Sequence, residues 1–301
     1  MNQTQTISLS APAKVNLFLR VLRRRSDGFH ELETLFQAID YCDDVLIELN
    51  DLGQISLEVT GLEVGPVKEN LAYRAASAYR KAAGLHEGIH VSLAKHIPAG
   101  AGLGGGSSDA AAVLRGLDYL TKGLLDSESL SKIASNIGSD VPFFLSDSTT
   151  AIARGRGEIL EPIQALPGHT LLLVLPPVHV STRDAYEMLG RSSDDYEHHT
   201  SPGLVSARGG WDTVISSAHN DFEVTIADLY PEVRCSLGAL RQKGYPLVLL
   251  SGSGGACFAI TRNGGDVESD AHELTEELGW PCLVTRTLES YQLITPMSAK
   301  P

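Results

Sequence analysis

The first third of the chain alternates apolar and polar residues in the way that predicts β-strands. Between residues 14 and 22, Val15, Leu17, Leu19 and Val21 occupy every second position, which places them on one face of a sheet. Residues 11–13 predict a break before this strand, and Asp27-Gly28 predicts a hairpin turn after it. Further strands are predicted at 7–10, 32–39, 44–49 and 55–60.

Helical periodicity then interleaves with strand patterns. Asn70 can cap a helix that ends before Gly84, and Asp126 can cap another that ends near Gly138. Between them lie a strand at 90–97 and a helix at 107–120, and a hairpin follows at 150–163, turning at 154–157. Later strands are predicted at 170–175, 247–250, 256–260 and 281–288, and later helices at 181–189, 221–228, 231–243 and 269–278.

The pattern restarts after Leu166-Pro167-Gly168, which places a domain boundary between residues 166 and 167. Early strands followed by interleaved helices predict an α+β fold with two domains, 1–166 and 167–301. The polar, Gly/Ser-rich stretch 190–212 is predicted to be a long loop or a disordered segment.

Composition narrows the classes of function. A formal net charge of −13 argues against binding to nucleic acid or to an acidic membrane. The four cysteines form no C-x-x-C pair, so reduced thiols are expected. The polar residues 1–10 lack the apolar core of a signal peptide, and no apolar run approaches membrane-spanning length. These features predict a soluble, cytoplasmic protein, and they leave its oligomeric state open.

Residues 98–112 form the most distinctive stretch of the chain. Five glycines are followed by Ser107, Ser108, Asp109 and an alanine-rich run that favours a helix. A glycine loop that opens a helix directs several backbone N–H groups at one point, where the helix dipole adds positive potential. The stretch therefore predicts a phosphate-binding loop, with Ser107, Ser108 and Asp109 available to cap the helix.

Two better-known loops do not fit this stretch. A P-loop requires a lysine before the serines, and none is present. Gly100, Gly102 and Gly105 satisfy the spacing of the dinucleotide fingerprint, but Asp118, the nearest acidic residue at the required distance, lies in a predicted helix. The flanking strand and helix argue against a flexible linker.

Asp140 and Lys14 are candidates for catalytic chemistry. Asp140 lies between Gly138 and Pro142, where an aspartate is either a base facing a site or a turn residue. Lys14 starts a strand, where a lysine is either solvated or placed to hold a nearby carboxylate ionised. Residue patterns alone leave these alternatives open.

The whole pattern Pro-x-x-x-Gly-Leu-Gly-x-Gly-Ser-Ser-x-Ala resembles the phosphate-binding motif of the GHMP kinase superfamily. The segments 12–17, 138–142 and 251–255 are similar to its other motifs. The resemblance implies an N-terminal domain like the second domain of ribosomal protein S5, a ferredoxin-like C-terminal domain, and an active site in the cleft between them. It further implies a kinase that uses ATP and Mg²⁺, with Asp140 and Lys14 as catalytic residues.

The same resemblance assigns residues to the nucleotide, and Ser108 is a candidate for holding the metal. Lys95 and Asn70 occupy positions where family members bring groups to the nucleotide side, although Asn70 is also an ordinary helix cap. The residues implied for ATP binding are Pro98, Ala99, Gly100, Ala101, Gly102, Leu103, Gly104, Gly105, Gly106, Ser107, Ser108, Asn70 and Lys95.

The segments 25–30 and 33–36 are most similar to the corresponding segments of the 4-diphosphocytidyl-2-C-methyl-D-erythritol kinase family. At the position of Phe29, that family more commonly has a tyrosine. The resemblance implies the small molecule diphosphocytidyl-methylerythritol as substrate. Phe29 and Tyr186 are expected to sandwich its cytosine across the domain boundary. The hairpin 153–158 matches the family but has no assigned chemistry. The residues implied for substrate binding are Asn16, Phe29, His30, Thr182 and Tyr186.

Two other functions compete with this one. The chain could be a homoserine or mevalonate kinase of the same superfamily, but those lack a segment like 25–30. It could also be a nucleotide-binding relative without catalysis, which retention of both Lys14 and Asp140 argues against.

Overall fold

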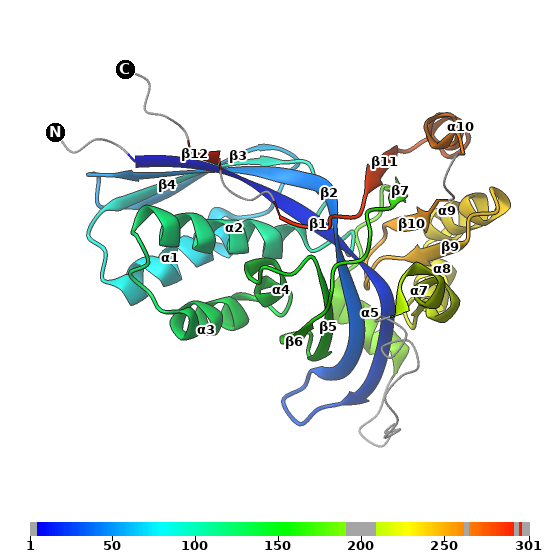
Figure 1. The fold of residues 1–301 in the computed structure, drawn as a ribbon, viewed down its shortest axis with the longest axis horizontal. Helices are drawn as coiled ribbons and strands as arrows, with labels where there is room; N and C mark the ends of the chain where they lie inside the picture. Colours follow the sequence, from blue (N-terminus) through cyan, green and yellow to red (C-terminus); the bar gives the residue numbers. More distant parts are fainter. Residues whose placement is uncertain (1–4, 191–208, 262–264, 292–294, 297–301) are drawn as a thin grey trace.

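A computed structural model describes residues 5–190, 209–261, 265–291 and 295–296 of the chain. Two β-sheets organise these residues, with helices packed against each (Figure 1). Within the described residues, no helix has the length and apolar character needed to cross a membrane.

The larger sheet has eight strands and is built on the long antiparallel pair of β1 (Gln5–Arg24) and β2 (His30–Asn50). On its other edge, β2 pairs with β4 along its C-terminal half and with β5 along its N-terminal half. β3 runs parallel to β4, whereas β8 and β12 come from late in the chain and pair with β1. The strands are β1 (Gln5–Arg24), β2 (His30–Asn50), β3 (Ile55–Gly61), β4 (Gly88–Lys95), β5 (Thr150–Gly155), β6 (Ile159–Pro162), β8 (His219–Asn220) and β12 (Thr295–Pro296).

The predicted break at residues 11–13 is wrong, because β1 runs through it. The pairing of β1 with β2 shifts register between Pro12 and Ala13, so an irregularity absorbs the proline without ending the strand. The same shift merges the predicted strands 32–39 and 44–49 into the single strand β2.

Helices cover one face of the larger sheet (Figure 1). Asn70 and Asp126 cap α1 and α3 as predicted, and Gly84 ends α1 in the left-handed conformation. The segment around Pro142 forms the short helix α4, with the proline in its first turn. The elements are η1 (Val67–Glu69), α1 (Leu71–Ala83), α2 (Gly105–Leu120), α3 (Ser127–Ile137) and α4 (Val141–Leu145).

The smaller sheet has the order β11-β7-β10-β9, with every neighbouring pair antiparallel. This order, with helices between β7 and β9 and between β10 and β11, is the β-α-β-β-α-β pattern of a ferredoxin-like domain. Its strands are β7 (Thr170–Val174), β9 (Leu247–Leu250), β10 (Cys257–Ile260) and β11 (Cys282–Arg286). Its helices are α5 (Thr182–Leu189), α7 (Trp211–Ser217), α8 (Glu223–Leu229), α9 (Pro231–Gln242) and α10 (Val267–Leu278).

Only the two ends of the loop predicted at residues 190–212 belong to the described part of the structure. Its stretch 191–208 lies outside the described residues. At its end, Trp211 and Asp212 already belong to α7, so the predicted loop extends too far.

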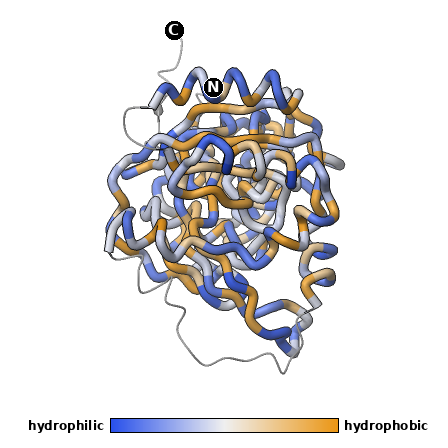
Figure 2. Tube along the Cα trace, turned by 90° about the vertical axis from the view of Figure 1, so that its right-hand side faces the viewer, coloured by the Kyte–Doolittle hydropathy of each residue, from blue (hydrophilic) through white to orange (hydrophobic). Residues whose placement is uncertain are grey.

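Buried apolar side chains join the two sheets into one body. One cluster fills the space between the larger sheet and its helices, and another lies between the smaller sheet and its own. A third cluster combines Val15 and Leu17 of β1 with Leu173 of β7 and Phe258 of β10. Hydrophobic stretches accordingly run through the middle of the trace in Figure 2. The shared core fixes the position of β1 relative to the smaller sheet.

Two helical glycines provide a test of this packing. A Cβ on Gly116 of α2 would lie 2.4 Å from Ile47 Cδ1 and 2.9 Å from Leu9 Cδ1, whereas a Cβ on Gly238 of α9 would meet nothing within 4 Å. We expect Gly116→Val to lower the free energy of unfolding by ~1–3 kcal/mol, because the core must move aside. Gly238→Ala should raise it by ~0.5–1 kcal/mol. Chemical denaturation measures both, and effects of the same sign would contradict the packing described here.

Candidate active site

A cleft of about 1870 Å³ gathers residues from distant parts of the chain. Its walls are the glycine loop, the β1–β2 hairpin, α5 and the residues just before α4. Of the residues that the sequence assigns to a site, the cleft brings together all except Ser108. Ser108 is buried, and its hydroxyl has no hydrogen-bond partner in the described part of the chain.

The glycine loop enters the cleft between β4 and α2. Gly100, Gly102 and Gly104 have φ of 72°, 80° and 72°, which disfavours side chains at all three positions. Gly104 is the residue at the start of α2, so the predicted caps Ser107, Ser108 and Asp109 lie inside the helix instead. The first turn of this helix begins with Gly105 and Gly106, which line the cleft, and the N–H groups of a first helical turn have no partner within the helix. This geometry suits an anion.

A second glycine loop supports the first from behind. A Cβ on Gly254 would lie 2.0 Å from the backbone nitrogen of Gly102, so the two backbones touch. The backbone nitrogens of Gly255 and Ala256 donate to the carbonyls of Gly100 and Ala101 at 3.3 and 3.0 Å. The sequence shows two glycine-rich segments, but only the fold shows that each requires glycine because of the other.

Lys14 and Asp140 meet at the floor of the cleft. Lys14 is 4% exposed, and its Nζ lies 3.8 Å from Asp140 Oδ2. Lys14 Nζ also donates to Asn16 Oδ1 and to the carbonyl of Gly102, both at 2.7 Å. Burial lowers the pKa of Lys14, and the charge of Asp140 acts in the opposite direction. Lys14 is therefore not the solvated strand-end lysine that the sequence left open.

Asp140 is not a capping residue either. It precedes α4, yet its side chain accepts no cap hydrogen bond, and it is 30% exposed toward the cleft. A carboxylate held beside an ammonium group, next to a helix N-terminus that can bind an anion, can accept a proton from a bound hydroxyl.

The hairpin between β1 and β2 forms the far end of the cleft. Phe29 at its tip is 51% exposed. His30 stacks on Tyr186 of α5, with ring centroids 5.0 Å apart and planes 20° apart. In the described structure, His30 rather than Phe29 therefore covers one face of Tyr186. Burial raises the pKa of the Tyr186 hydroxyl. Thr182 lies one turn earlier, exposed, on the same helix.

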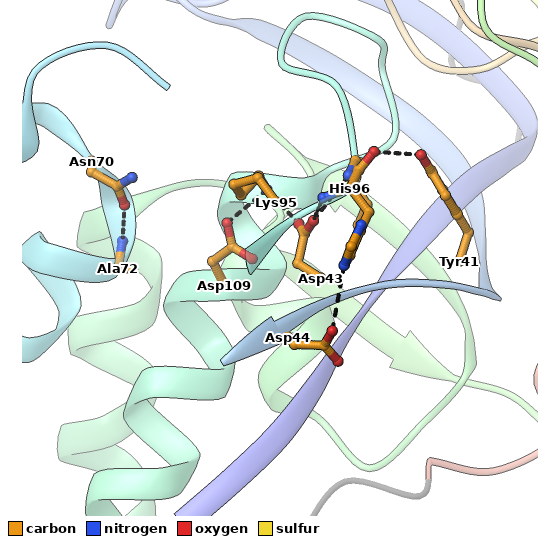
Figure 3. Close-up of polar contacts among 9 residues, drawn as sticks. Tyr41, Asp43, Asp44, Asn70, Ala72, Lys95, His96 and Asp109 are labelled. Atoms are coloured by element: carbon orange, nitrogen blue, oxygen red, sulfur yellow. Dashed lines mark hydrogen bonds and ion pairs between the residues drawn. The ribbon is translucent and has the colours of Figure 1, made fainter. Parts of the chain in front are cut away.

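Lys95 belongs to a buried cluster beneath the glycine loop. Figure 3 shows its ammonium group between the carboxylates of Asp43 and Asp109, while Asn70 lies apart and caps α1 through Ala72. Lys95 Nζ donates to Asp109 Oδ2 at 2.8 Å and also to Asp43 Oδ2. The other oxygen of Asp43 accepts from the backbone nitrogens of His96 and Ile97 at 2.6 and 2.9 Å. The cluster thus ties the end of β4 to the start of α2.

Two carboxylates share a single lysine in this cluster, and Asp109 Oδ1 has no partner within the described residues. Burial raises the pKa of Asp109 to about 7, opposed by Lys95 and reinforced by Asp43. Neither aspartate stands out in the sequence as a site residue, because Asp109 resembles a helix cap and Asp43 lies within an ordinary strand pattern.

Two family models match the chain, one for the GHMP kinases N terminal domain over residues 70–148 and one for the GHMP kinases C terminal over residues 206–279. The 4-diphosphocytidyl-2-C-methyl-D-erythritol kinase of Geobacter metallireducens is 37% identical over 286 residues, covering 94% of this chain and 99% of that protein. The enzyme of the same name from Shouchella clausii is 39% identical over 255 residues, covering 84% of this chain and 85% of that protein.

Solved structures agree with these matches. A crystal structure of 4-(cytidine 5'-diphospho)-2C-methyl-D-erythritol kinase has a TM-score of 0.73 at 38% identity, covering 93% of this chain and 98% of that one. A homoserine kinase from Cytophaga hutchinsonii has a TM-score of 0.74 at 17% identity, covering 99% and 98% of the two chains. At that identity, the second match shows a shared fold alone.

The buried cluster predicts a particular dependence of stability on pH. Because the folded-state pKa of Asp109 is raised from its ordinary value of 3.8 to about 7, the folded protein binds more protons than the unfolded chain in this window. The contribution of Asp109 to stability therefore falls as pH rises from 4 to 7. Asp109→Asn should remove this loss. The free energy of unfolding of the variant should therefore rise relative to that of wild type as pH increases from 4 to 7, by up to ~1.4 kcal/mol for each pH unit.

Urea denaturation of both proteins at several pH values between 4 and 8 measures the difference. Glu128→Gln, at an exposed ion pair on α3, is the control and should show no such trend. A difference between Asp109→Asn and wild type that does not change with pH would mean that Asp109 is ionised throughout this range.

Proposed function

The chain belongs to the GHMP kinase family, and from this premise we propose that it phosphorylates the 2-hydroxyl of 4-diphosphocytidyl-2-C-methyl-D-erythritol with ATP. The observation that carries the proposal is the convergence of three separate segments on one cleft: the glycine loop, the Lys14–Asp140 pair and the hairpin tip with Phe29 and His30. Relatives of that name cover nearly the whole chain, which supports the same acceptor.

We assign the phosphates of ATP to the glycine loop and the first turn of α2, where backbone N–H groups and the helix dipole favour negative charge. Asn70 also lines the cleft, and we assign it to the nucleotide as well. In this proposal Lys95 supports the glycine loop from below, because its ammonium group is held by Asp43 and Asp109.

Phosphoryl transfer requires mainly positioning and stabilisation of charge. In the proposed reaction, the 2-hydroxyl attacks the γ-phosphorus, the bond from that phosphorus to the bridging oxygen breaks, and ADP leaves. Asp140 accepts the proton of the hydroxyl. Lys14 lies beside this carboxylate and orients it, and its charge stabilises the developing negative charge. Asn16 orients Lys14 and is itself held by Thr34 at 2.7 Å.

Mg²⁺ would neutralise charge on the ATP phosphates. The described residues contain no group of three or more acidic, histidine or cysteine side chains that could hold a metal. Ser107 does offer a hydroxyl oxygen at the cleft wall, which fits an ion held mainly by phosphates and one protein ligand. Ser107 replaces the buried Ser108 as the hydroxyl in this role.

The cytidine end of the substrate is assigned to Phe29, His30, Thr182 and Tyr186. We retain residues 1–166 as the ATP-binding part and 167–301 as the substrate-binding part, with the hairpin tip reaching across to α5. We also propose a cytoplasmic location, supported by four cysteines that are all free thiols.

A comparison of acceptors tests the proposed function directly. Purified protein with ATP and Mg²⁺ should form ADP with diphosphocytidyl-methylerythritol, and at least ~100-fold more slowly with homoserine or mevalonate, because missed polar contacts reject wrong substrates. Similar rates with all three, or turnover of homoserine or mevalonate alone, would refute the assigned acceptor while leaving a kinase.

Asp140→Asn tests the proposed base. We expect turnover to fall ~10²–10⁴-fold, because loss of a general base removes proton transfer from the transition state. Affinity for an ATP analogue should change little. Asp147→Asn, at an exposed carboxylate paired with Arg115, is the matched control and should behave as wild type. Turnover within a few-fold of wild type in Asp140→Asn would show that this carboxylate is not the base.

A further inference from the structure

The turn between β5 and β6 brings an arginine into the cleft that the proposed reaction has not yet used. Gly155 and Gly157, with φ of 74° and 112°, shape this turn on either side of Arg156. Arg156 lines the cleft, whereas Arg154, two residues earlier, makes an ion pair with Glu161 at 2.9 Å and does not line it. One hairpin thus carries two arginines, of which only Arg156 lines the site.

Arg156 lies between the two ends of the proposed substrate site. Its guanidinium carbon is 4.8 Å from the centroid of the Phe29 ring, at the hairpin tip assigned to cytidine. The next residue, Gly157, lies against the proposed base, since a Cβ there would be 3.7 Å from Asp140 Oδ1. The order along the cleft is therefore aromatic tip, guanidinium, carboxylate.

The positive charge of Arg156 is partly compensated by Glu158 and by Asp27, whose pKa that charge helps to lower. Its Nε is 3.8 Å from Glu158 Oε1, beyond hydrogen-bond distance, and Glu158 Oε2 accepts instead from the backbone nitrogen of Arg156 at 2.6 Å. Two other cations at the cleft wall, Lys14 and Arg25, are more firmly engaged. Lys14 donates to two oxygens, and Arg25 is paired with Asp27 and Glu31 at 3.1 and 2.9 Å. Arg23, Arg24 and Arg183 also line the cleft, and all three are exposed.

The proposed substrate has its parts in the same order as the cleft. A diphosphate separates its cytidine from the methylerythritol that carries the reacting hydroxyl. In a protein with a formal charge of −13, this anionic group needs a local cation, and a planar guanidinium can bind phosphate oxygens in pairs. We propose that Arg156 binds the diphosphate of the cytidine substrate. This inference rests on the function proposed above.

Arg156→Met removes the charge and keeps much of the side-chain volume, and Arg154→Met is the matched control on the same hairpin. Binding of CDP, cytidine and an ATP analogue to wild type and both variants is measured by NMR titration, with thermal melting to confirm folding. We expect Arg156→Met to weaken CDP binding about 10- to 100-fold, as for loss of a charge-assisted hydrogen bond. Cytidine and the ATP analogue should bind as before, and Arg154→Met should change none of the three.

The outcomes separate this inference from the proposed function. If wild type binds no CDP and does not phosphorylate the diphosphocytidyl substrate, the proposed function is wrong. If wild type does both, but Arg156→Met binds CDP normally, the role of Arg156 is wrong. Equal losses for CDP and cytidine would also overturn it, because Arg156 would then only support the Phe29 ring. Should Arg156→Met fail to fold, Arg156→Lys, which keeps the charge without the paired donors, should show a smaller loss confined to CDP.

Discussion

Direct backbone contact between two glycine loops sets the geometry of the whole cleft. The contact point is Gly102, where neither loop leaves room for a Cβ. Its carbonyl accepts from Ser251 Oγ at 3.1 Å and from Lys14 Nζ at 2.7 Å. A single carbonyl therefore links the two glycine loops to the lysine beside Asp140. Displacing either loop would move the proposed anion site and the proposed base together.

The two buried lysines have opposite electrostatic surroundings. Lys14 has neutral hydrogen-bond partners and one carboxylate at 3.8 Å, so its charge acts at the cleft floor. Lys95 donates to both Asp43 and Asp109, so its charge is compensated by two buried carboxylates. Because burial of an ion is costly without partners, each lysine is placed by the groups around it. Lys14 lies at the proposed active site, and Lys95 ties the end of β4 to the start of α2 beneath the glycine loop.

Long strands make this arrangement rigid. β1 contributes Lys14 to the cleft, Val15 and Leu17 to the core shared with the smaller sheet, and residues near its N-terminus to the core under α2. β2 continues the hairpin that carries Phe29 and His30 to α5. Since β8 returns from late in the chain to pair with β1, the two halves are tied together by backbone hydrogen bonds as well as by apolar contacts.

The sequence by itself determined the α+β class, most of the elements, and the glycine loop with Lys14 and Asp140 as candidates, because these depend on local periodicity, backbone freedom and motif spacing. Tertiary structure decided what required contact between distant segments. It carried β1 through Pro12 by a register shift against β2, and it buried Ser108 while leaving Ser107 in the cleft. It also joined Lys95 to Asp43 and Asp109, residues 52 and 14 positions away. Burial and electrostatic pairing depend on proximity in space, which no local pattern in the sequence specifies.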